Sequence, residues 1–283
     1  MRGRRVIVVM LLYPQPPKGG FKYQTKPMGR AVKIAVLIPD RGDRPQFLKN
    51  CMRMLAAQTV LPAHVEVVNF PAVIPRSSEE TCIASEIQGV STPLRSAQHD
   101  NRICDITKRY RTGYDRLRNK GFDVIALIEN DDWYSPQYLE TMAEMWLRFK
   151  EPQLMGTGYT IYYHLKLRAW FPINHPRRAS AMNTLINPDL FIDWPPDHEP
   201  FTDAHIWKQL PGCLFTPEKH IALGMKHGEG LCGGLTHNNR SARFVNKDPD
   251  FEWLKGVVDA ESFEFYKNLY PQPPKGGLTA SSQ

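Results

Sequence analysis

Three acidic residues, Glu129, Asp131 and Asp132, follow a short apolar run at residues 124–128. The run has no polar interruption, which is typical of a strand buried on both faces of a parallel sheet. Neighbouring carboxylates repel one another, and a divalent cation would relieve that repulsion. Oxygen ligands of this kind favour Mg²⁺ or Mn²⁺, which commonly bind one or two carboxylates together with substrate phosphates. The alternative is a solvated acidic turn that precedes a helix beginning near Ser135.

The segments around the acidic residues alternate between predicted strands and helices. The segments VKIAVLI at residues 32–38 and VEVVNF at residues 65–70 predict two strands before the one at residues 124–128. Apolar residues at helical spacing follow each of these runs, which predicts connecting helices. Strands that alternate with helices form βαβ units, so we expect an α/β fold with a mostly parallel sheet flanked by helices. Ligands of such sheets bind at the carboxyl ends of the strands, where the acidic residues lie.

A helix predicted near residues 103–118 carries both apolar and basic residues. Tyr110 and Tyr114 belong to its inward face, whereas Lys108 and Arg109 are expected on other faces. A basic helix face is usually solvated. These two side chains could instead reach a diphosphate.

The sequence pattern of the chain changes after residue 152. Residues 155–167 and 168–173 are rich in aromatic and β-branched residues and predict strands. A short helix begins near Thr202 or Asp203, and a glycine-rich segment further on carries His227 and His237.

The composition indicates a folded globular protein with a preference for anionic partners. Hydrophobic residues make up 42% of the 283 residues, and the formal net charge is +7. The five scattered cysteines include no C-x-x-C pair, so we expect free thiols rather than disulfides or a zinc site. The apolar N-terminal run is too short to span a membrane, and no cleavage site follows it. These features favour a cytoplasmic protein, in the host cytoplasm if it is viral.

Three motifs resemble those of GT-A glycosyltransferases, a Rossmann-like α/β family, and within it the inverting family-2 type. The segment IAVLIPDRGDRPQFLKNCMRMLAAQT is similar to the opening strand, Arg-Pro turn and helix of that family. The segment LIENDDWYSPQYL resembles its D-x-D-D motif, with Glu129 in place of the first Asp. In FTDAHIW, Asp203 matches the Asp of the later acidic motif. The departure at Asn69, where the family usually has Asp, bears on base specificity.

The resemblance implies transfer of a hexose from a nucleotide-sugar donor, such as UDP-glucose or another UDP-sugar, to an acceptor hydroxyl. Asp131 and Asp132 would bind Mn²⁺ or Mg²⁺, with a further ligand from His227 or His237, although each histidine has a structural alternative. Asp203 would be the general base, and its alternative is a helix cap. The implied donor contacts are Pro39, Asp40, Arg41, Arg44, Asn69, Lys108, Arg109, Glu129 and Asn130.

The domain organisation and the acceptor follow as expectations. Residues 1–27 form an extension, 28–150 the donor half, 151–250 the acceptor and catalytic half, and 251–283 a C-terminal helix and Pro/Gly-rich tail. Basic residues in the acceptor half favour a hydroxymethylated base in DNA, as in viral enzymes that modify their own DNA. Three alternatives remain: a glycan or protein acceptor, a nucleotidyltransferase, and a non-catalytic nucleic-acid-binding protein.

Overall fold

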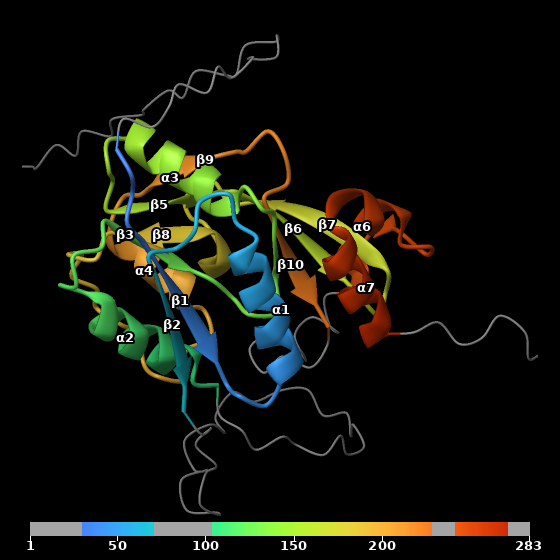
Figure 1. Cartoon of the computed structure of the whole chain (residues 1–283). Helices are drawn as coiled ribbons and strands as arrows, with labels where there is room; N and C mark the ends of the chain where they lie inside the picture. Colours follow the sequence, from blue (N-terminus) through green and yellow to red (C-terminus); the bar gives the residue numbers. More distant parts are fainter. Residues whose placement is uncertain (1–29, 71–103, 228–240, 271–283) are drawn as a thin grey trace, which may run out of the picture. The chain divides into compact units, whose positions relative to one another are not determined.

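The strand β1 (Ile34–Asp40) is an inner strand of the larger of two sheets, and all of its residues are buried. β2 (His64–Asn69) and β3 (Val124–Leu127) pair with it in parallel on either side. Figure 1 shows this sheet, whose strand order is β2-β1-β3-β8-β5-β9. The structure, a computed structural model, describes residues 30–70, 104–227 and 241–270. Because parallel strands end at one edge, Asp40, Asn69 and the residues after Leu127 lie at the same edge.

Three helices connect and flank these strands: α1 (Pro45–Ala56), α2 (Ile106–Leu117) and α3 (Tyr138–Arg148). α1 begins at a proline, whose missing N–H has no intrahelical partner in the first turn anyway. α2 packs against β1 and β2 through a cluster that includes Tyr110 and Leu37. Of the residues that the apolar spacing assigns to one face of α1, Phe47, Cys51 and Leu55 are buried, whereas Met52 is exposed.

The second half completes the larger sheet and builds a smaller one. In the larger sheet, antiparallel β8 (Thr184–Ile186) joins β3 to β5 (Leu154–Thr157), which pairs with β9 (Cys213–Phe215). The smaller sheet has the strand order β11-β7-β6-β10-β4. Its members are β4 (Trp133–Tyr134), β6 (Tyr159–His164), β7 (Ala169–Asn174), β10 (Ala222–Lys226) and β11 (Asn246–Lys247).

Short helices complete the described part of the chain. The helix α4 (Thr202–Gln209) lies in the connection between β8 and β9. The other short elements are η1 (Ala181–Asn183), η2 (Ser241–Arg243), α6 (Glu252–Val257) and α7 (Ala260–Leu269).

The predicted α/β class with a mostly parallel sheet is confirmed, since three of the five pairings in the larger sheet are parallel. The prediction of a single strand at residues 155–167 is wrong. The chain leaves the larger sheet after Thr157 and enters the smaller one at Tyr159, so that β5 and β6 belong to different sheets. Only Gly158 separates the two strands, so the composition did not reveal this break.

The structure contradicts one expectation about the whole chain and leaves others untested. The expectation that every cysteine is a free thiol is wrong for Cys104, which is disulfide-bonded, whereas Cys51 and Cys213 are free. Among the residues that the structure describes, no helix is both long and apolar enough to cross a membrane. The N-terminal extension lies outside the described residues, and the division at residues 150 and 250 remains a prediction.

Candidate active site

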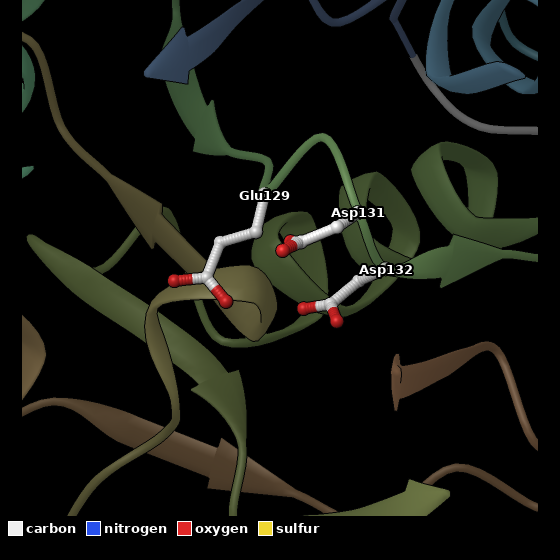
Figure 2. A group of neighbouring side chains, drawn as sticks. All are labelled: Glu129, Asp131 and Asp132. Carbon is white, nitrogen blue, oxygen red and sulfur yellow. The ribbon is translucent and has the colours of Figure 1, made fainter. Parts of the chain in front are cut away.

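The acidic residues after β3 turn their side chains toward a common space, as Figure 2 shows. One carboxylate oxygen from each of Glu129, Asp131 and Asp132 lies within 4.8 Å of the others. A turn produces this convergence, because the amide N–H of Asp132 donates to the carbonyl oxygen of Glu129 over 3.3 Å. The chain then enters β4, which pairs antiparallel with β10. That pairing fixes the end of β10, and with it His227, beside the acidic residues.

Asp131 contacts two other candidate residues through one oxygen, Oδ2. Arg44 Nη1 donates to it over 3.1 Å, and His227 Nε2 lies 2.8 Å from it. Arg44 Nη1 is also 2.7 Å from His227 Nε2, so the three atoms form a compact triangle. Burial alone would raise the pKa of Asp131, but the hydrogen bond with His227 and the charge of Arg44 outweigh it and lower that pKa. The contacts with His227 and Arg44 therefore favour the ionised form of the Asp131 carboxyl.

Asp132 is more deeply buried than Asp131 and is less well compensated. Its Oδ1 accepts a 2.7 Å hydrogen bond from the amide of Met225 in β10. Its Oδ2 is buried and has no hydrogen-bond partner among the described residues. Burial raises the pKa of Asp132, and the negative charges of Glu129 and Asp131 raise it further against the charge of Lys226. A buried, uncompensated carboxylate oxygen of this kind is what a cation would satisfy.

This donor set fits a small divalent cation. Two ligands at right angles on Mg²⁺, with bonds of about 2.0–2.1 Å, lie about 2.9 Å apart. The separation of Asp131 Oδ2 and His227 Nε2 is 2.8 Å. Carboxylate oxygens suit Mg²⁺ or Mn²⁺. Of the two histidines predicted as ligands, His227 therefore lies at the site, and His237 falls outside the described residues.

The predicted donor contacts at the strand ends form one hydrogen-bonded network. The carboxylate of Asp40 accepts from Asn130 Nδ2 over 2.6 Å and from Asn69 Nδ2 over 2.9 Å. These contacts tie together the ends of β1, β2 and β3. Gly42, at a φ of +78°, allows the next turn to approach Asn69, because a Cβ there would lie 3.0 Å from its amide atoms. Pro39 is buried in β1, opposite Val68.

Lys108 and Arg41 lie beside this network. The ammonium of Lys108 lies 5.3 Å from the centre of the Phe70 ring. Arg41 forms an ion pair with Asp43 over 2.9 Å, within the turn that joins β1 to α1. Both cations are near the strand ends.

Arg109 is fully buried, which corrects the expectation that it lies outside the inward face of its helix. Its guanidinium binds the carboxylate of Asp105 through two nitrogens, at 2.9 and 2.6 Å. The remaining N–H groups donate to the carbonyl oxygens at the ends of β1 and β2, namely those of Asp40, Val68 and Phe70. All of its donors thus bind protein groups. Its burial follows from the aspartate four residues earlier, which compensates the charge.

We expect Arg109→Met to lower the free energy of unfolding by about 3–5 kcal/mol, because it leaves the buried Asp105 carboxylate without its cation. Urea denaturation would measure this loss. Arg111→Met is the matched control, since 39% of the Arg111 side chain is exposed and it pairs with Asp197. Equal stability of the two variants would contradict the structural role of Arg109.

Asp203, the candidate base, lies in the first turn of α4, where the N-cap residue is Phe201. It is therefore not the helix cap that the alternative required. Its carboxylate is paired with Arg178, and 14% of its side chain is exposed. Burial raises the pKa of Asp203, and Arg178 and the backbone N–H of Ala204 oppose that rise. Asp203 also influences the pKa of Glu129, so the two acidic groups are close enough to interact.

Sequence reasoning missed two residues of this site, Lys226 and Tyr162. Lys226 interacts electrostatically with Asp132, Glu129 and Asp131, and these charges raise the pKa of its ammonium although burial opposes the rise. Its ammonium lies 4.8 Å from the centre of the Tyr162 ring. The one sequence signal that pointed to Lys226 was its position next to His227.

Comparisons with known proteins concern the fold alone. No protein-family model matches the chain, and no curated protein matches its sequence significantly. The structure is similar to that of S. aureus TarS 1–349 in complex with UDP-GlcNAc, with 10% identity and a TM-score of 0.45 over 84% of this chain and 79% of that chain. TarS 1–349 gives a TM-score of 0.40 at 10% identity over the same shares. A third TarS structure gives 0.40 at 11% identity, over 85% of this chain and 50% of that one.

Proposed function

We propose that this protein is a metal-dependent glycosyltransferase that uses a nucleotide-sugar donor, with a UDP-sugar as the first candidate. One observation carries the proposal. Glu129, Asp131 and Asp132 converge at the carboxyl edge of a mostly parallel sheet, where His227 contacts Asp131 and Asp203 lies within electrostatic range of Glu129. The resemblance of three sequence motifs to GT-A enzymes supports the same reading.

The residues would divide the chemistry as follows. Asp131, Asp132 and His227 would hold Mn²⁺ or Mg²⁺, which would neutralise charge on the leaving diphosphate. Asp203 would accept the proton of the acceptor hydroxyl as its oxygen forms a bond to the anomeric carbon. The bond from that carbon to the diphosphate oxygen would break, and a nucleoside diphosphate would leave. Attack opposite to the leaving group inverts the anomeric configuration.

The network of Asp40, Asn69 and Asn130 would position the donor. These side chains hold the three strand ends in a fixed arrangement, and Arg41, Arg44 and Lys108 supply positive charge beside it. A nucleotidyltransferase would need a glycine-rich phosphate loop after β1, whereas the turn there contains only Gly42. That difference favours the glycosyltransferase.

We expect hydrolysis or transfer from at least one nucleotide sugar in the presence of Mn²⁺, and none after addition of EDTA. A panel of UDP-, GDP-, ADP- and dTDP-sugars, read by release of nucleoside diphosphate, would identify the donor. Full activity in EDTA would contradict the proposed metal dependence. Release of pyrophosphate from a nucleoside triphosphate and a sugar phosphate would instead support a nucleotidyltransferase.

We propose a hydroxymethylated base in DNA as the acceptor. The net charge of +7 supports it, together with basic Arg177 beside Arg178, the partner of Asp203. The test is transfer of labelled sugar to hydroxymethylated and unmodified duplexes of one sequence. DNA binding should also weaken by roughly one power of salt concentration per phosphate neutralised. Labelling of a glycan or protein acceptor, without labelling of either duplex, would contradict the DNA acceptor and keep the glycosyltransferase.

A further inference from the structure

The end of β10 brings three consecutive residues to the acidic cluster. The amide of Met225 donates to Asp132 over 2.7 Å, and the ring of His227 contacts Asp131 over 2.8 Å. Lys226 lies between them. Because side chains alternate along a strand, its side chain leaves the opposite face from that of Met225.

A close approach between two strands determines where the Lys226 ammonium lies. Gly224 is in register with Tyr162 of β6, and a Cβ on Gly224 would be 2.3 Å from a ring carbon of Tyr162. Glycine therefore lets the ring lie flat against β10. Lys226 is two residues further along the same face, and its ammonium lies 4.8 Å from the centre of that ring.

Hydrogen bonding fixes the ring itself. The hydroxyl of Tyr162 is 2.9 Å from Oγ of Ser180, two residues after Arg178, which pairs with Asp203. The ring thus contacts the segment whose Arg178 pairs with the candidate base, and the ammonium of Lys226 lies over that ring. No hydrogen bond or ion pair of the Lys226 ammonium is found among residues 30–70, 104–227 and 241–270, so its N–H groups are available to a ligand.

We propose that Lys226 binds the β-phosphate of the nucleotide-sugar donor and stabilises the negative charge that develops on the leaving diphosphate. This inference rests on the proposed function. With a divalent cation on the carboxylates, Arg44 and Lys226 would make the local charge positive, which suits an anionic diphosphate. Tyr162 would direct the ammonium, because a cation is attracted to the face of an aromatic ring. Lys226 and not Arg44 receives this role because the nitrogen Nη1 of Arg44 already contacts Asp131 and His227.

The test compares binding of UDP and UMP by calorimetry in the presence of Mn²⁺. The variant Lys226→Met should weaken UDP binding about 10-fold or more, which is the loss expected for one charge-assisted hydrogen bond, and should leave UMP binding nearly unchanged. Lys226→Arg should retain most of the UDP affinity because it keeps the charge. Lys219→Met is the matched control, since Lys219 is exposed in the turn before β10 and the charge change is the same. Inorganic pyrophosphate should follow the UDP pattern, because it carries the diphosphate without a base.

The outcomes separate this inference from the proposed function. Equal UDP affinity in wild type and Lys226→Met would overturn the role of Lys226. The proposed metal dependence and the nucleotide-sugar donor would be unaffected by that result. Parallel losses of UDP and UMP affinity with a lower melting temperature would also overturn it, by showing that Lys226 acts through the fold. If wild type binds no nucleoside diphosphate of the donor panel in Mn²⁺, the proposed function fails, and the inference fails with it.

Discussion

Replacing Asp131 with asparagine is expected to remove the dependence of nucleoside diphosphate binding on Mn²⁺ and to lower transfer by a factor of about 10³ or more. The reason is that Asp131 Oδ2 is the shared point of the cluster, in contact with both Arg44 and His227. An amide carries no charge and is a poor substitute for a carboxylate in a site with a divalent cation. Calorimetric titration of UDP with and without Mn²⁺ would measure the coupling directly.

A matched control separates the metal from general electrostatics. Asp115→Asn makes the same change in charge at an exposed position of α2, where the nearest cation, Arg118, is 3.9 Å away. It should leave both the Mn²⁺ coupling and the rate as in wild type. If Asp131→Asn keeps the coupling, or if both variants lose it equally, Asp131 is not a metal ligand and the site requires another explanation.

The carboxyl edge of the sheet was predictable from the sequence because it depends on local patterns. β1 and β3 are apolar and β2 is rich in valine, and the polar residues Asp40, Asn69 and Glu129 stand at their carboxyl ends. Parallel pairing then brings these positions together without further information. The fold class and the position of the acidic cluster followed from that rule.

The residues that depend on long-range pairing were harder to predict. His227 reaches Asp131 because β10 pairs with both β4 and β6, and no local pattern specifies that pairing. Lys226 depends on the same pairing and on the contact between Gly224 and Tyr162. Arg109 was assigned to an outer face because of its charge, although Asp105 at four residues' distance compensates that charge inside the protein.

Asp203→Asn should lower kcat by a factor of about 10² or more and leave UDP affinity nearly unchanged, because a general base acts in the chemical step and not in donor binding. Asp203 lies in the first turn of α4 with Arg178 as its partner. Asp193→Asn is the control, since Asp193 is exposed in the segment that precedes α4. A variant with lower UDP affinity and a lower melting temperature, but with the kcat of wild type, would show that the Asp203 carboxylate is structural.

The pH dependence of kcat tests the same residue through its partner. A base must be ionised, so kcat falls as the pH drops through the pKa of Asp203, which burial raises above its usual value. Arg178 opposes that rise by stabilising the carboxylate. Arg178→Met should therefore raise the pKa further and move the acidic limb of the kcat profile to higher pH, whereas Arg177→Met at the neighbouring position should not. A profile that stays in place when Arg178 is replaced, or an acidic limb that persists in Asp203→Asn, would assign the proton transfer to another group.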